Sequence, residues 1–212
     1  MNNSINYLWN HGTEENWLEA LKQYDVIIDS RSVEAWLIED FMEKLDAEDI
    51  KNMSVEEFYN FLYEKYFVWV FTQKNRLAST RKHLQRYVDE NRMIELENIQ
   101  KKLFSTNHSN IKECLKIAMD IRGLGIAGAS GLLAVLFPND FGTVNEPLVE
   151  ILRGIDGIQH ADELLAMKPS TANDGVVVIK LFREKAEELN KKFNTGFWTP
   201  RKIDKVLWAC TR

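Results

Sequence analysis

Two short segments of this sequence carry residues whose types and spacing suit chemistry at a charged group. The first is the glycine pair Gly123 and Gly125, just before a helical pattern that opens at Ile126. Backbone amides at such a helix start point toward an anion, which the positive end of the helix dipole also favours. The second is Asn145 followed by Glu146. A carboxylate can stabilise cationic character that develops during bond cleavage, whereas an asparagine hydrogen-bonds but brings no charge.

The Asn145–Glu146 pair also has a plainer interpretation. Asparagine is a favoured N-cap, and a glutamate one residue later lies near the positive end of the helix dipole. Cap chemistry explains both residues without any ligand. Both interpretations stay open at the level of sequence, and the elements around the two segments decide where the residues can meet.

Helical periodicity flanks the glycine pair on both sides. Apolar side chains recur at Ile111, Leu115, Ala118 and Met119, which predicts a helix over 111–122. Gly123 then suits a left-handed C-cap. A second helix, apolar on every side, is predicted over 126–137, and it is too short for a membrane span of about 20 residues.

Glycines inside this second helix need an explanation. Gly128 and Gly131 each cost about 1 kcal/mol relative to alanine in a helix interior. We therefore expect the small residues here to let another backbone come close.

A family resemblance follows from this pattern. A helix, a glycine loop and a small-residue helix resemble the helix-hairpin-helix motif, and Phe141-Gly142-Thr143-Val144-Asn145-Glu146-Pro147-Leu148-Val149 is similar to the segment after the hairpin in the helix-hairpin-helix DNA glycosylases. The resemblance covers residues 111–153. It implies that the hairpin backbone holds a phosphate of double-stranded DNA, often with a monovalent cation; no other cofactor is expected. The implied hairpin contacts are Gly123, Leu124, Gly125, Ile126 and Ala127.

The sequence departs from the family at two positions. Asn145 stands where the family has a catalytic aspartate, and Ala127 stands where some members have a catalytic lysine. Glu146 is a candidate for the carboxylate in a shifted register. The resemblance thus implies a protein that binds damaged or modified DNA, with altered or absent base excision. Two alternatives are an active glycosylase with a non-standard carboxylate and a helical interaction module without DNA binding.

Charge is distributed unevenly along the chain. Residues 1–60 hold 14 Asp and Glu against four Lys and Arg, a net charge of −10, whereas residues 61–212 are net +5. Residues 73–87 carry five Lys and Arg and no acid, which suits phosphate contact or simply a solvated basic helix. The candidates for flanking phosphates are Lys74, Arg76, Arg81, Lys82, Arg201 and Lys202.

Composition is that of an ordinary globular protein, with 45% apolar and 28% charged residues. The start of the chain lacks the basic and apolar regions of a signal peptide, and no stretch suits a membrane span, so we expect a cytoplasmic protein without a membrane partner. The four histidines are scattered and the two cysteines lack ligand spacing, so no metal site is expected.

The predicted fold is all-α, with about eight to ten helices. Helices are expected over 13–28, after a cap at Ser30 or Ser32, after a capping box formed by Ser54 and Glu57, over 90–104 and 173–193, and from Pro200 after a cap at Thr199. An aromatic run from Phe58 to Phe71 has the spacing of a buried helix, which favours a core over a stacking platform for bases. We expect an acidic helical segment, 1–60, packed on a glycosylase-like domain, 61–212.

Overall fold

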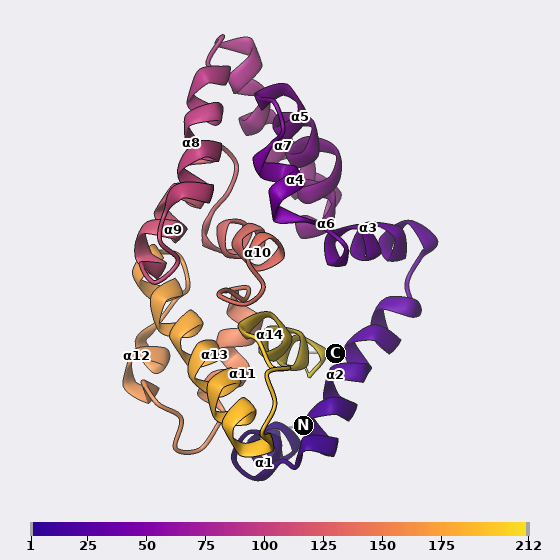
Figure 1. Ribbon diagram of the computed structural model, residues 1–212, viewed down its shortest axis with the longest axis vertical. Coiled ribbons are helices and arrows are strands. Elements are labelled where there is room, and N and C mark those ends of the chain that lie inside the picture. Colours follow the sequence, from indigo (N-terminus) through magenta and orange to yellow (C-terminus); the bar gives the residue numbers. More distant parts are fainter. Residues whose placement is uncertain (1, 211–212) are drawn as a thin grey trace.

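The computed structural model describes residues 2–210 and shows an all-α protein with no strand in that range (Figure 1). The all-α prediction is confirmed, although short helices make the expected number of elements too low. The elements are α1 (Asn2–His11), α2 (Glu14–Asp29), α3 (Val33–Glu43), α4 (Ala47–Lys51), α5 (Val55–Phe61), the π-helix η1 (Leu62–Tyr66), α6 (Phe67–Val70), α7 (Lys74–Asp89), α8 (Met93–Ser105), α9 (Ile111–Met119), α10 (Ile126–Leu136), α11 (Glu146–Arg153), α12 (Ala161–Ala166), α13 (Ala172–Phe193) and α14 (Pro200–Ala209).

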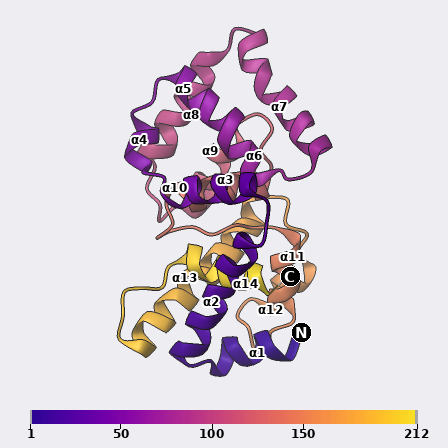
Figure 2. The same ribbon diagram turned by 90° about the vertical axis from the view of Figure 1, so that its right-hand side faces the viewer.

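The helices form two groups with α10 between them. One group contains α4 to α8, and the other contains α1, α2 and α11 to α14, as both views show (Figures 1 and 2). Ten of the eleven residues of α10 are buried, the exception being Ala127. The helix that the sequence predicted to be apolar on every side is therefore the centre of the fold. Within residues 2–210, no helix is both long and apolar enough to cross a membrane.

Local sequence signals fix several helix starts. The hydroxyl of Thr199 accepts the amide of Lys202, and Pro200 occupies the first turn of α14. Ser54 and Glu57 form a reciprocal capping box at α5, and Ser32 caps α3. Each cap satisfies an amide that the helix itself leaves unpaired. These predicted starts are confirmed.

The turn between α9 and α10, residues 120–125, keeps the predicted glycine geometry. Gly123 has a φ of +98°, in the left-handed region. The first helix ends at Met119 rather than at 122, and the Tyr87 hydroxyl binds the turn that follows it. It donates to the Asp120 carbonyl at 3.1 Å and accepts the Arg122 amide at 3.2 Å. α7, which carries Tyr87, therefore holds this turn in place.

The small residues of α10 admit both a neighbouring backbone and side chains: the Val144 amide donates to the Ser130 Oγ at 2.8 Å, whereas the two glycines accommodate side chains. A Cβ on Gly131 would lie 2.8 Å from the Tyr66 hydroxyl, and one on Gly128 would lie 3.4 Å from the Phe71 ring. The Tyr66 hydroxyl donates to the Gly128 carbonyl. A second close backbone is found at Gly123, where a Cβ would lie 2.8 Å from the Thr80 carbonyl oxygen of α7.

The two glycines of this turn provide a matched pair of substitutions. Gly123→Ala should lower the free energy of unfolding by about 1–3 kcal/mol, because the backbone is left-handed and the neighbouring carbonyl cannot move away easily. Gly125→Ala should stay within about 0.5 kcal/mol, since nothing lies within 4 Å of its Cβ position. Urea unfolding followed by circular dichroism measures both. Equal losses for the two variants would contradict the turn geometry.

The aromatic run builds the core around α10. Phe58, Phe61, Leu62, Tyr66 and Phe67 are all buried, which confirms the core interpretation for these residues. The run is divided by η1, so it does not continue as one α-helix. Trp69, near its end, is only partly buried and faces a cavity described below.

The acidic N-terminal segment shares one core with the rest of the chain. Trp17 packs edge-on against Trp198 at 5.6 Å, and Tyr24 packs against Trp208 at 5.1 Å. The expected division at residue 60 falls inside α5, so no linker separates the two parts. The N-terminal segment therefore packs into the same hydrophobic core as the rest of the chain.

Candidate functional site

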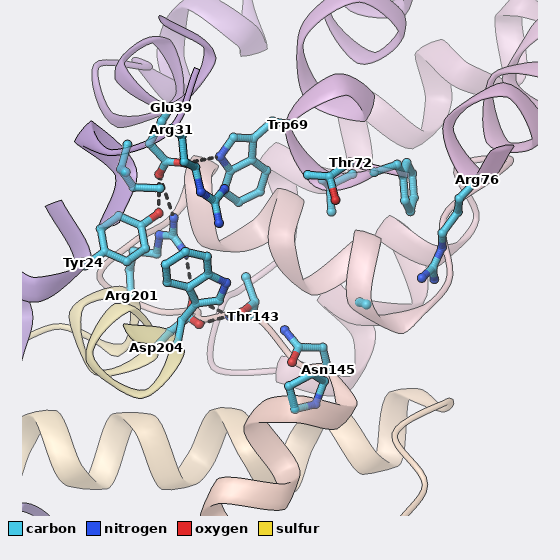
Figure 3. A pocket seen from close by; sticks show the side chains of 16 residues that line it. Tyr24, Arg31, Glu39, Trp69, Thr72, Arg76, Thr143, Asn145, Arg201 and Asp204 are labelled. Atoms are coloured by element: carbon cyan, nitrogen blue, oxygen red, sulfur yellow. Dashed lines mark hydrogen bonds and ion pairs between the residues drawn. The ribbon is translucent and has the colours of Figure 1, made fainter. Parts of the chain in front are cut away.

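A cavity of about 540 Å³ opens beside the start of α10, and we call it the central cavity (Figure 3). Its lining combines α2, α3, α6, α7, α10, α14 and the segment before α11. Ala127 and Asn145, two positions singled out in the sequence, both line it. The exposed Thr72 and Arg76 belong to its outer part, whereas the buried Glu39, Arg201 and Asp204 form its inner wall.

The inner wall is a buried network of charges. Arg201 is 7% exposed, and its Nη1 donates to Asp204 at 2.7 Å. Asp204, fully buried, also accepts the amide of Thr143 at 3.0 Å and its hydroxyl at 2.6 Å. The carboxylate of Asp204 therefore ties the segment before α11 to α14. Burial alone would lower the pKa of Arg201, but Asp204 and the other neighbouring acids raise it above its ordinary value.

Glu39 forms the second half of this network. Its carboxylate accepts the Tyr24 hydroxyl and, at 2.7 Å, the indole Nε1 of Trp69. The Arg201 Nη2 lies 3.7 Å from Glu39 and 3.6 Å from Glu43, beyond hydrogen-bond distance. Burial, together with Glu39, raises the pKa of Tyr24, so the phenol stays protonated and remains a donor.

Asn145 combines the two roles that the sequence left open. It is the N-cap of α11, and its Oδ1 accepts the Leu148 amide at 3.1 Å. The same side chain lines the central cavity (Figure 3). Asn145 is therefore a helix cap, as one of the two interpretations held. The cap uses its Oδ1 and leaves its Nδ2 as a hydrogen-bond donor for another group.

Glu146 does not lie where a carboxylate in a shifted register would have to lie. It is absent from the lining of the central cavity, and its half-exposed side chain pairs with Arg153 at 3.1 Å. Asn145 and Pro147 line the cavity, whereas Glu146 between them points away, because successive residues at a helix start face different directions. The candidate catalytic role of Glu146 is not supported by its position.

The start of α10 is open to solvent. Gly125 is exposed and provides no side-chain cap, and no acidic residue lies in the first turn. The amides of Ile126, Ala127 and Gly128 belong to a helix start, where no intrahelical partner exists. An anion placed here would meet several donors at once.

Some basic residues of α7 are exposed to solvent, and one is bound to the rest of the protein. Lys74, Arg76 and Lys82 are exposed, and the Arg76 guanidinium lies 5.4 Å from the centre of the Phe71 ring. Arg81 instead donates from Nε and Nη2 to the Tyr63 carbonyl, at 3.0 and 2.7 Å. The guanidinium of Arg81 is thus used to bind a backbone carbonyl of η1, so the predicted phosphate contact by Arg81 is not supported.

Neither of the two candidates on α14, Arg201 and Lys202, has a free, exposed side chain. Arg201 is buried in the network described above, so it does not form a surface contact to phosphate. The Lys202 Nζ donates to the Phe197 carbonyl at 2.8 Å and lies 3.5 Å from the centre of that ring. Burial lowers the pKa of Lys202. The predicted basic patch is therefore reduced to α7.

Several lining residues were missed from the sequence. Arg31 lies in the connection between α2 and α3, where no periodicity marks it. Glu39 is the buried polar residue of α3, whereas the adjacent Asp40 pairs with Lys44. Trp208 lies on α14, the last helix, and no pattern in the sequence marks it as a lining residue.

Comparison with known proteins adds no identification. The chain matches no protein-family model, no curated protein and no solved structure.

Proposed function

We propose that this protein binds double-stranded DNA through a helix-hairpin-helix formed by α9 and α10, and receives an extruded nucleotide in the central cavity with weak or absent base excision. The observation that carries the proposal is the common lining of that cavity by Ala127, at the hairpin, and Asn145. A phosphate held by the hairpin would place its own nucleotide near the cavity opening.

Support for phosphate binding comes from the start of α10 and its neighbour α7. The uncapped helix start supplies amides, and α7 contacts the turn through the Thr80 carbonyl next to Gly123. Lys74, Arg76 and Lys82 on α7 are exposed. Amides with lysines and arginines nearby are what backbone recognition without base readout requires. The monovalent cation at the hairpin loop stays a prediction of the family resemblance.

Support for nucleotide binding comes from the size and lining of the central cavity. Ligand cavities commonly enclose about 300–1,000 Å³, and this one has about 540 Å³. Trp69 and Trp208 line it, and aromatic side chains of this kind are typical of cavities that take a nucleobase.

Weak or absent catalysis follows from the carboxylates near the cavity. Asp204 and Glu39 both use their oxygens in internal hydrogen bonds. Asn145 is uncharged, and Glu146 points away from the cavity. Among the described residues, each carboxylate of the cavity lining is buried and already hydrogen-bonded to the protein, so none is placed to stabilise a developing sugar cation.

The test of DNA binding is a titration of paired duplex DNA at several salt concentrations. Arg76→Ala should make the dependence of log affinity on log salt shallower by about one unit. Gly125→Ala should weaken binding while the protein keeps its stability, because a methyl group there would obstruct a phosphate but touches nothing in the protein. Lys191→Ala on α13, an exposed charge outside the cavity lining, is the control. Wild-type binding by both test variants would overturn the assigned face.

A helical interaction module is the second candidate, favoured by α3. Its outer face exposes Val33, Trp36, Leu37 and Phe41, with exposed fractions from 39% to 70%. Contiguous exposed apolar side chains often mark an interaction surface. Complete absence of duplex binding at low salt would favour this candidate over the first.

A further inference from the structure

We infer that the central cavity selects nucleobases rich in carbonyl oxygens, and that Arg31 is the residue that distinguishes them. This inference rests on the proposed function and names the substrate class of the same site. It follows from which polar groups in the cavity are already occupied and which remain available.

The two carboxylates of the cavity, Asp204 and Glu39, are buried, and each of their oxygens already accepts a hydrogen bond from the protein. Both oxygens of Asp204 receive hydrogen bonds, from Thr143 and from Arg201. Both oxygens of Glu39 receive one as well, from Tyr24 and Trp69. Asn145 uses its Oδ1 for the cap of α11. An incoming base with amino groups would therefore find few acceptors for its hydrogens, and a buried unpaired donor is costly.

The available groups are donors. In the part of the chain that the structure describes, Arg31 has no ion-pair partner within 4.0 Å and no side-chain hydrogen bond. Its guanidinium lies over the Trp208 ring, 4.9 Å from the ring centre. Stacking of this kind holds the plane of the guanidinium and leaves its edge for planar acceptors. Arg31 and Asn145, from distant parts of the chain, both belong to the lining (Figure 3).

The balance of charge points in the same direction. Arg31, Arg76 and Arg201 line the cavity against two acids, Glu39 and Asp204. A base made cationic by alkylation would be repelled, whereas carbonyl oxygens would be attracted. At the one position where uracil and cytosine differ, a guanidinium N–H can donate to the carbonyl oxygen of uracil, whereas the amino group of cytosine would set a donor against a donor.

Uracil and cytosine provide a matched pair of ligands for the test, because they differ by a carbonyl against an amino group at one position. We would measure affinities for otherwise identical duplexes that carry one unpaired uracil, one unpaired cytosine, one 7-methylguanine or no lesion. Wild type should prefer the uracil duplex to the cytosine duplex by about tenfold, and should show no preference for 7-methylguanine.

Variants at Arg31 separate this inference from the proposed function. Arg31→Ala should abolish the uracil preference and leave affinity for the paired duplex at the wild-type level. Arg31→Lys keeps the charge but loses the planar guanidinium that stacks on Trp208, and it should retain only a small part of the preference. Lys22→Ala, an exposed charge on α2 outside the lining, should behave as wild type.

The outcomes are distinct. A preference for cytosine or 7-methylguanine, or a uracil preference that survives in Arg31→Ala, overturns the inference while DNA binding stands. Absence of binding to every duplex overturns the proposed function and the inference with it. Circular dichroism of each variant confirms that its helix content is unchanged.

Discussion

Asp204→Ala is expected to lower the free energy of unfolding by about 3–5 kcal/mol, a large part of the 5–15 kcal/mol typical of a domain. Asp204 is fully buried and is the nearest partner of Arg201, which is itself only 7% exposed. Removal of the carboxylate leaves a buried guanidinium without its strongest partner. It also leaves the amide and hydroxyl of Thr143 without an acceptor.

Two further variants give this prediction its control. Glu146→Ala breaks a half-exposed ion pair with Arg153 and should cost no more than about 1 kcal/mol. Addition of Arg201→Met to Asp204→Ala should recover part of the loss, because the uncompensated charge is then gone. Urea unfolding measures all three. A loss below about 1 kcal/mol for Asp204→Ala would show that the buried network does not hold α14 to the segment before α11.

Asn145→Asp is expected to create or raise base-excision activity by at least about tenfold, which corresponds to about 1.4 kcal/mol of transition-state stabilisation. One oxygen of the new carboxylate can keep the Leu148 amide of the α11 cap, as Oδ1 of Asn145 does now. The other would replace Nδ2 in a side chain that lines the cavity. The substitution therefore adds a charge at the candidate site without loss of the cap.

The measurement is release of free base from a panel of damaged and modified duplexes by both proteins. Asn145→Ala is the control, since it loses the cap, costs about 0.5–2 kcal/mol in stability and should gain no activity. Robust wild-type activity that survives Asn145→Ala would remove residue 145 from the mechanism. Loss of such activity in Glu146→Gln would move the carboxylate role to Glu146, against its outward position in the structure.

The sequence predicted best what depends on neighbours along the chain. Helical spacing located α10 within one residue at its end, and the serine and threonine caps located the starts of α3, α5 and α14. Gly123 was assigned its left-handed conformation from its place after an apolar stripe. These features are local, so the residues that determine them lie within a few positions of one another.

The sequence predicted least well what depends on partners from distant segments. Arginines usually lie at the surface, and nothing in the sequence was a reason to place Arg81 and Arg201 elsewhere. In the structure, Arg81 binds a carbonyl of η1, and Arg201 lies among acids from α3 and α14. The central cavity is assembled from segments that span residues 24 to 208. Periodicity within one helix cannot show which distant segments meet, and so Arg31 and Glu39 were not expected there.

The most direct test of the central claim is the affinity of the wild-type protein for a duplex with one unpaired nucleotide, compared with the fully paired duplex of the same length. The account predicts tighter binding of the duplex with the unpaired nucleotide. It also predicts that Thr72→Phe, which would fill the outer part of the cavity, abolishes this difference but not the binding itself. Equal affinity of wild type for the two duplexes, or a difference unaffected by Thr72→Phe, would contradict the claim that the cavity receives an extruded nucleotide.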